Sequence, residues 1–175
     1  TNEQMQALSS EIMPQLAAHS DAILMNDALF EKIKSVYDRR FSLDLDDEQR
    51  RLTEKIYSRF ERSGALLSEQ DKSRLKLINE QLTSLGVKFG QNVLAETNAF
   101  EFELEQDDLL GVPTQVREAA QEYAKSIDKK GKYIFTLQKP SMLPLLTYAQ
   151  NREVRENIYK AYIARANNGG ENDNN

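Results

Sequence analysis

The stretch that decides the fold is Ser68–Phe100, SEQDKSRLKLINEQLTSLGVKFGQNVLAETNAF. Its apolar residues recur at steps of three and four, which is the spacing of one helical face: Leu75, Ile78, Leu82, Leu85, Phe89 and Val93. Ser68 followed by Asp71 is a variant of the capping box and marks the start of the helix. The stretch therefore predicts one long helix. Gly86 and Gly90 interrupt a neighbouring face and predict a closely packed second helix there, or a bend.

Helical spacing also precedes this stretch. The first segment carries Pro14, which predicts a kink or the first turn of a fresh helix. Asn26 is placed to cap a second helix, and Asp46, Asp47 and Glu48 favour the first turn of a third. Gly64 is the expected stop of that third helix.

The period changes to two after residue 98. AFEFELE, at 99–105, alternates aromatic or aliphatic residues with glutamate. KYIFTLQ, at 132–138, carries Tyr133, Phe135 and Leu137 at alternate positions. Alternation of this kind predicts two strands, which we expect to pair. Pro113 opens a helix between them and Gly131 turns the chain back. Two further helices follow, one after Pro140 and one capped by Asn151.

The expected fold class is therefore mainly α. We predict an elongated domain of about six to eight helices, with a small two-stranded β element around residues 99–105 and 132–138. Residues 1–166 would form this helical domain. Residues 167–175, NNGGENDNN, would form a flexible polar segment.

Composition narrows the classes of function. The chain has 175 residues, a formal net charge of −5, one histidine and no cysteine. The negative charge argues against a nucleic-acid partner, and no apolar run is long enough for a membrane helix. The missing cysteines exclude thiolate chemistry and cysteine-based zinc sites.

No complete catalytic site is visible. His19 stands alone, so a paired histidine metal site is excluded, and it reads as an ordinary helix residue. The acidic run LDLDDE, at 43–48, lacks the glycine and the final glutamate of an EF-hand, and the tail offers only Glu171 and Asp173. Arginines could clamp a peptide carboxylate, although most arginines on helix surfaces do not: Arg39, Arg40, Arg59, Arg62, Arg152, Arg155 and Arg165. We therefore expect no catalytic, cofactor-binding or metal-binding residue in this chain.

Three co-linear stretches nonetheless resemble a known family. They are NDALFEKIKSVYDRR (26–40), SGALLSEQDKSRLKLINEQLTSLGVKFGQNVLAETNAF (63–100) and the stretch from Phe135 to Asn174 that begins FTLQKPSMLPLLTYAQ. Together they resemble the N-terminal, non-catalytic portion of the thimet-oligopeptidase-like zinc metallopeptidases. The bacterial peptidyl-dipeptidase (Dcp) branch is the most similar.

This resemblance implies the N-terminal wall of a peptide channel in a zinc peptidase that releases C-terminal dipeptides. Its zinc, held by a His-Glu-x-x-His helix, and its catalytic residues would lie in a C-terminal half. Since this chain lacks that motif, the resemblance implies that it is inactive alone. The polar end would be a connection cut short, and Tyr148, Arg152 and Tyr162 are candidates for facing the channel. The implied partners are that catalytic half and short peptides, with no nucleic acid and no membrane.

Two alternatives stay open. The chain could be a free-standing helical module that binds peptides, or a scaffold that dimerises through the Leu75–Val93 face. The expected compartment is the cytoplasm, with the periplasm as the alternative.

Overall fold

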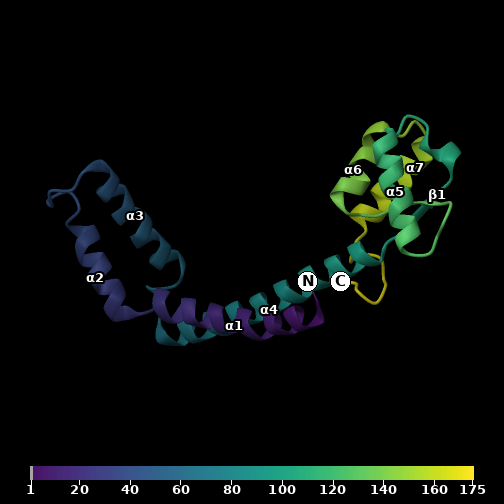
Figure 1. Cartoon of the computed structure of the whole chain (residues 1–175). Coiled ribbons are helices and arrows are strands. Elements are labelled where there is room, and N and C mark those ends of the chain that lie inside the picture. Colours follow the sequence, from purple (N-terminus) through teal and green to yellow (C-terminus); the bar gives the residue numbers. More distant parts are fainter. Residues whose placement is uncertain (1) are drawn as a thin grey trace. The chain divides into compact units, whose positions relative to one another are not determined.

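The computed structural model describes residues 2–175. It is 69% helical, and the described residues form seven α-helices and one two-stranded antiparallel sheet (Figure 1). This confirms the predicted fold class. The chain forms two compact units, Thr1–Lys88 and Phe89–Asn175, and the division falls inside the longest helix. The expected boundary between residues 166 and 167 stays a prediction.

The first unit contains three helices and the first part of a fourth. They are α1 (Glu3–Leu24), α2 (Asp27–Asp38), α3 (Asp47–Arg62) and α4 (Glu69–Ala99). Helix α1 continues through Pro14, so the alternative of a fresh helix at that residue is wrong. Asn26 caps α2 by accepting the Leu29 N–H at 2.8 Å, and Asp46 caps α3 together with Gln49. Gly64 adopts φ +96° just after α3, as expected for a helix stop.

Aromatic packing holds α2 against α3, which run as a hairpin in Figure 1. Phe30 and Phe60 are buried, and their ring centroids lie 6.2 Å apart. Tyr57 completes the cluster and stacks on Tyr37 at 3.9 Å, with the two rings nearly parallel. Burial of these rings contributes to the apolar stabilisation of the hairpin.

Polar contacts join the remaining helices of this unit. Asn79 on α4 donates to both carboxylate oxygens of Asp21 on α1 at 3.0 Å. Lys72 is buried, and its ammonium contacts Asp27 and, at 3.1 Å, Glu69. The hydrogen bond to Asp27 raises the pKa of Lys72, which keeps this buried amine charged.

Helix α4 begins as its sequence predicts. The Ser68 hydroxyl accepts the Asp71 N–H at 3.2 Å and donates to the Asp71 carboxylate at 2.7 Å. The expected close packing at the two glycines is absent, because nothing in residues 2–175 lies within 4 Å of a Cβ built on Gly86 or Gly90. The apolar face of α4 is also largely exposed, and Leu82 and Leu85 keep 61% and 62% of their surface.

The second unit begins inside α4, at Phe89. It contains β1 (Phe102–Leu104), a 3-10 turn η1 (Gln106–Leu109), α5 (Thr114–Ser126), β2 (Tyr133–Phe135), α6 (Lys139–Tyr148) and α7 (Arg152–Ile163). The two strands pair, as predicted. They run antiparallel with Phe102 opposite Phe135, and both are shorter than the alternating stretches. Sequence periodicity gave no sign of η1.

The core of this unit lies between the sheet and its helices. It contains the fully buried Phe135, Leu145 and Ile158, together with Leu104, Leu109, Val112, Ala120, Leu137, Met142, Ala149 and Val154. Helix α5 packs on β2, and α6 packs on α7. The second unit therefore has its own hydrophobic core.

The solvent-exposed side of β1 and of the residues next to it carries the glutamates that the alternating pattern predicts. Lys129 pairs with Glu101 at 2.7 Å, and Lys132 pairs with Glu103 at 3.1 Å and also contacts Glu105. These lysines precede β2, so the ion pairs cross between the two strands on their solvent side. Each pair adds little because it is exposed to water, but together they favour this register.

Candidate functional site

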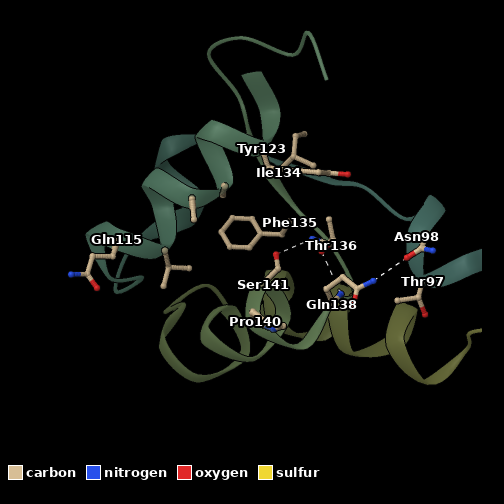
Figure 2. Close-up of a pocket in the computed structure, with 13 residues that line it drawn as sticks. Thr97, Asn98, Gln115, Tyr123, Ile134, Phe135, Thr136, Gln138, Pro140 and Ser141 are labelled. Atoms are coloured by element: carbon tan, nitrogen blue, oxygen red, sulfur yellow. Dashed lines mark hydrogen bonds between the residues drawn. The ribbon is translucent and has the colours of Figure 1, made fainter. Parts of the chain in front are cut away.

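The candidate site is a cavity of about 580 Å³ in the second unit (Figure 2). Four elements meet around it: the end of α4, one face of α5, strand β2 and the start of α6. Cavities of this size are typical of sites for small molecules or single side chains.

The floor of the cavity is apolar. Ile134 and Phe135 come from β2 and are almost fully buried, and Val116 and Ala120 come from α5. In Figure 2 the Phe135 ring lies at the centre of the view. Strand β2 presents these side chains because α5 packs directly against it. Such a floor favours an apolar group.

The rim of the cavity is polar and carries no charged side chain. Gln138 Nε2 donates to Asn98 Oδ1 at 3.0 Å, which links α6 to α4 across the rim (Figure 2). The Thr136 N–H donates to Ser141 Oγ at 3.0 Å. This hydroxyl therefore gives the first backbone N–H after β2 a hydrogen-bond partner. Gln115 and Tyr123 also line the cavity. Amides and hydroxyls of this kind exchange hydrogen bonds with peptide groups.

Thr97 shows how the rim is held in place. Its hydroxyl donates to the Val93 carbonyl at 2.7 Å and accepts from Arg165 at 2.9 Å. Arg165 also donates to the Tyr162 carbonyl at 2.8 Å, and its guanidinium lies 3.7 Å from the Tyr162 ring centroid. This arginine therefore ties the end of α7 to α4.

The other arginines weighed from sequence have separate positions. Arg155 donates to the carbonyls of Ala149 and Gln150, where α6 ends, and Arg39 donates to the Ser35 carbonyl. Arg40 lies between the rings of Tyr37 and Phe41. Arg152 lines a shallow hollow on α7, and Arg59 and Arg62 line a groove on α3. None of these arginines lines the cavity.

The tyrosines suggested for a channel surface differ from each other. Tyr148 is 52% exposed at the end of α6, whereas Tyr162 is half-buried beneath Arg165 and packs on the core. Neither lines the cavity.

The terminal polar segment forms a hydrogen-bonded turn. The Asp173 carboxylate accepts backbone N–H groups from Asn168 at 2.8 Å, Asn175 at 2.7 Å and Gly169. Glu96 on α4 accepts from the Ala166 N–H and the Asn168 side chain, each at 2.8 Å. These bonds attach the turn to α4 within the second unit.

The carboxylates and the histidine do not form a metal site. His19 is exposed on α1. Asp46 caps α3, and Asp47 forms an ion pair with Arg50 of the same helix. Within residues 2–175, no group of three or more His, Asp or Glu side chains is arranged to hold a metal ion.

Sequence reasoning missed the cavity itself. Asn98, Gln138 and Ser141 are common neutral residues on three different segments, and no motif joins them. Their meeting depends on the pairing of β1 with β2 and on the packing of α5. The alternation in the two strands was the one signal that pointed to this region.

The fold is that of a mainly helical protein with a small antiparallel sheet, and comparison with known proteins identifies its family. No family model matches the chain. It is 34% identical over 174 residues to a dipeptidyl carboxypeptidase of Salmonella typhimurium, and this alignment covers 99% of the chain and 26% of that protein. It is 35% identical over 161 residues to an oligopeptidase A of Haemophilus influenzae, covering 91% of the chain and 24% of that protein.

A dipeptidyl carboxypeptidase of Escherichia coli matches at 32% identity over 174 residues. The chain is thus a homologue of the N-terminal portion of thimet-oligopeptidase-like enzymes, which confirms the resemblance seen in its sequence. It spans about a quarter of the length of these relatives.

None of the helices in residues 2–175 is both long enough and apolar enough to cross a membrane.

Proposed function

We propose that this chain is the N-terminal, channel-wall part of a zinc-dependent peptidyl-dipeptidase or oligopeptidase that releases dipeptides from the C-termini of short peptides. The observation that carries the proposal is the match over almost the whole chain to named peptidases four times its length. The zinc and its ligands would belong to a catalytic half of the same polypeptide. The expected compartment is the cytoplasm.

Two features of the structure support this role. The cavity of the second unit combines an apolar floor with an uncharged amide rim, which suits an apolar side chain and the peptide groups beside it. The first unit exposes many large apolar side chains, among them Leu8, Leu16, Leu52 and Leu77. An apolar surface this extensive is typical of a segment that another part of the protein covers.

Turnover by the purified chain tests the first consequence of the proposal. We expect no hydrolysis of a fluorogenic short peptide, with or without added zinc, because the chain has one histidine and no three-ligand group in its described part. Product formation that a chelator abolishes would contradict the proposal.

The mass of the native gene product separates this proposal from a free-standing peptide-binding module. An antibody raised against the chain should detect a band several times larger than 20.1 kDa in source cells. A band at the mass of the chain itself would favour the alternative, which the self-contained cavity of the second unit also supports.

A further inference from the structure

A second concave surface lies in the first unit, on the hairpin of α2 and α3. It is a groove of about 670 Å³ whose lining includes Arg51, Lys55, Arg59 and Arg62 from α3. These four cations face one carboxylate, that of Glu54. The charge of the groove is therefore opposite to the net charge of −5 on the whole chain.

Local structure accounts for only part of this cluster. Arg59 and Arg62 stand in the last turn of α3, where cations interact favourably with the helix dipole. Arg51 and Lys55 lie closer to the N-terminus of α3. Arg51 and Lys55 are four residues apart, and Lys55 and Arg59 are also four residues apart. Like charges at this spacing destabilise a helix.

Nearby carboxylates do not neutralise the groove. Glu54 lies 3.7 Å from Arg51 and is shared with Arg40 at 3.5 Å. Within residues 2–175, Lys55, Arg59 and Arg62 form no ion pair at 4.0 Å or less. The groove thus presents cations that are free to bind an anion.

The surroundings of Tyr37, whose ring lines the groove, indicate which class of anion the groove binds. Tyr57 and the Arg40 guanidinium each lie 3.9 Å from the centroid of the Tyr37 ring. Two groups at this distance cannot share one face, so both faces of Tyr37 are covered. Single-stranded nucleic acids rely on open aromatic faces for base stacking, and the groove offers none.

We propose that this groove binds an acidic segment of a peptide in extended conformation. Residues 51 to 62 span about 16 Å along α3, which matches about five extended residues. Carboxylates on alternate positions of such a segment would point to the same side and meet the row of cations. The hydroxyls of Ser58 and Ser63 add uncharged donors to the lining.

Binding of a labelled peptide to the intact chain tests the proposal without any reference to catalysis. The probe is a short peptide in which Glu alternates with Gly, measured by fluorescence anisotropy against the same peptide with Gln in place of Glu. We expect the Glu peptide to bind, the Gln peptide to bind at least about tenfold more weakly, and the difference to shrink near 0.3 M salt. Equal binding of the two peptides would overturn the proposal.

Paired variants locate the site. Lys55→Gln combined with Arg59→Gln should weaken binding of the Glu peptide about tenfold. Arg74→Gln combined with Lys76→Gln removes the same charge from exposed positions on α4 and should change binding less than about twofold. Equal losses in the two double variants would show that only net charge matters, and the groove assignment would be wrong.

Two further measurements complete the test. Lys55→Arg combined with Arg59→Lys keeps the charge and should retain binding, which separates loss of charge from loss of folding. A single-stranded oligonucleotide should bind more weakly than the Glu peptide. If it binds more tightly, the groove is a nucleic-acid site and the proposal fails.

Discussion

Asp173 organises the turn that ends the described chain. The backbone N–H groups of Asn175, Gly169 and Asn168 hold the pKa of the Asp173 carboxyl below its usual value. A carboxyl with a depressed pKa in the folded state stabilises the turn above its usual pKa. This contribution is lost as the pH falls through the lower, folded value.

We therefore expect the Gly169 amide proton to shift in an NMR pH titration with a midpoint below that of an ordinary aspartate. In Asp173→Asn this titration should disappear, because the amide side chain does not ionise. A midpoint at or above the usual aspartate value would contradict the hydrogen bonding described for this turn.

The roles of single arginines could not be predicted from sequence. Arg165 stacks on Tyr162, which is three residues away, but its hydrogen bond to Thr97 spans 68 residues. Arg155 donates to the Ala149 and Gln150 carbonyls where α6 ends, and this contact depends on the conformation of the connection between α6 and α7. Helix caps such as Asn26 and Asp46 were predictable because their partners lie three residues away.

At the scale of elements, two glycines with positive φ differ in how closely other atoms approach them. Gly111 has φ +86°, and a Cβ built on it would meet the Tyr148 carbonyl oxygen and, at 2.9 Å, the Gln150 side chain. Gly131 has φ +85°, but the space around it is open. Gly111 therefore combines a left-handed backbone with a close approach to α6, whereas Gly131 has only the backbone requirement.

This pair of glycines gives a matched comparison. Gly131→Ala should lower the free energy of unfolding by about 1 kcal/mol, because alanine is strained in this conformation. Gly111→Ala should lower it by about 3 kcal/mol, since the collision with the α6 backbone adds to that strain. Urea unfolding followed by circular dichroism measures both, and equal losses would mean that Tyr148 moves aside freely.

The sequence predicted which segments are helices and strands more reliably than it predicted what packs against each of them. Periodicity predicted α4 and both strands because these patterns report which residues share a face. It did not predict that the apolar face of α4 stays open, since burial depends on what packs there. The cavity of the second unit was missed for the same reason.

At the scale of the whole molecule, the uncovered face of α4 has consequences in solution. Leu82, Leu85 and Phe89 each keep more than half of their surface exposed. Apolar surface of this kind drives association when no other segment covers it.

We expect the average mass in sedimentation experiments to rise above 20.1 kDa as the concentration increases. Leu82→Asp should restore the monomer because it places a charge in the apolar face. Ser73→Asp adds the same charge outside that face and should leave association unchanged. A wild-type chain that stays monomeric at every concentration would exclude this face as a contact surface.

The stacked pair of Tyr37 and Tyr57 also gives the first unit an optical signature. The chain has no tryptophan, so its near-ultraviolet spectrum comes from seven tyrosines and seven phenylalanines. Two nearly parallel phenol rings 3.9 Å apart couple their electronic transitions, and this coupling exists only while α2 and α3 are packed together. Circular dichroism near 280 nm therefore contains a contribution from this hairpin, and its loss on separation of α2 from α3 is measurable in the unlabelled protein.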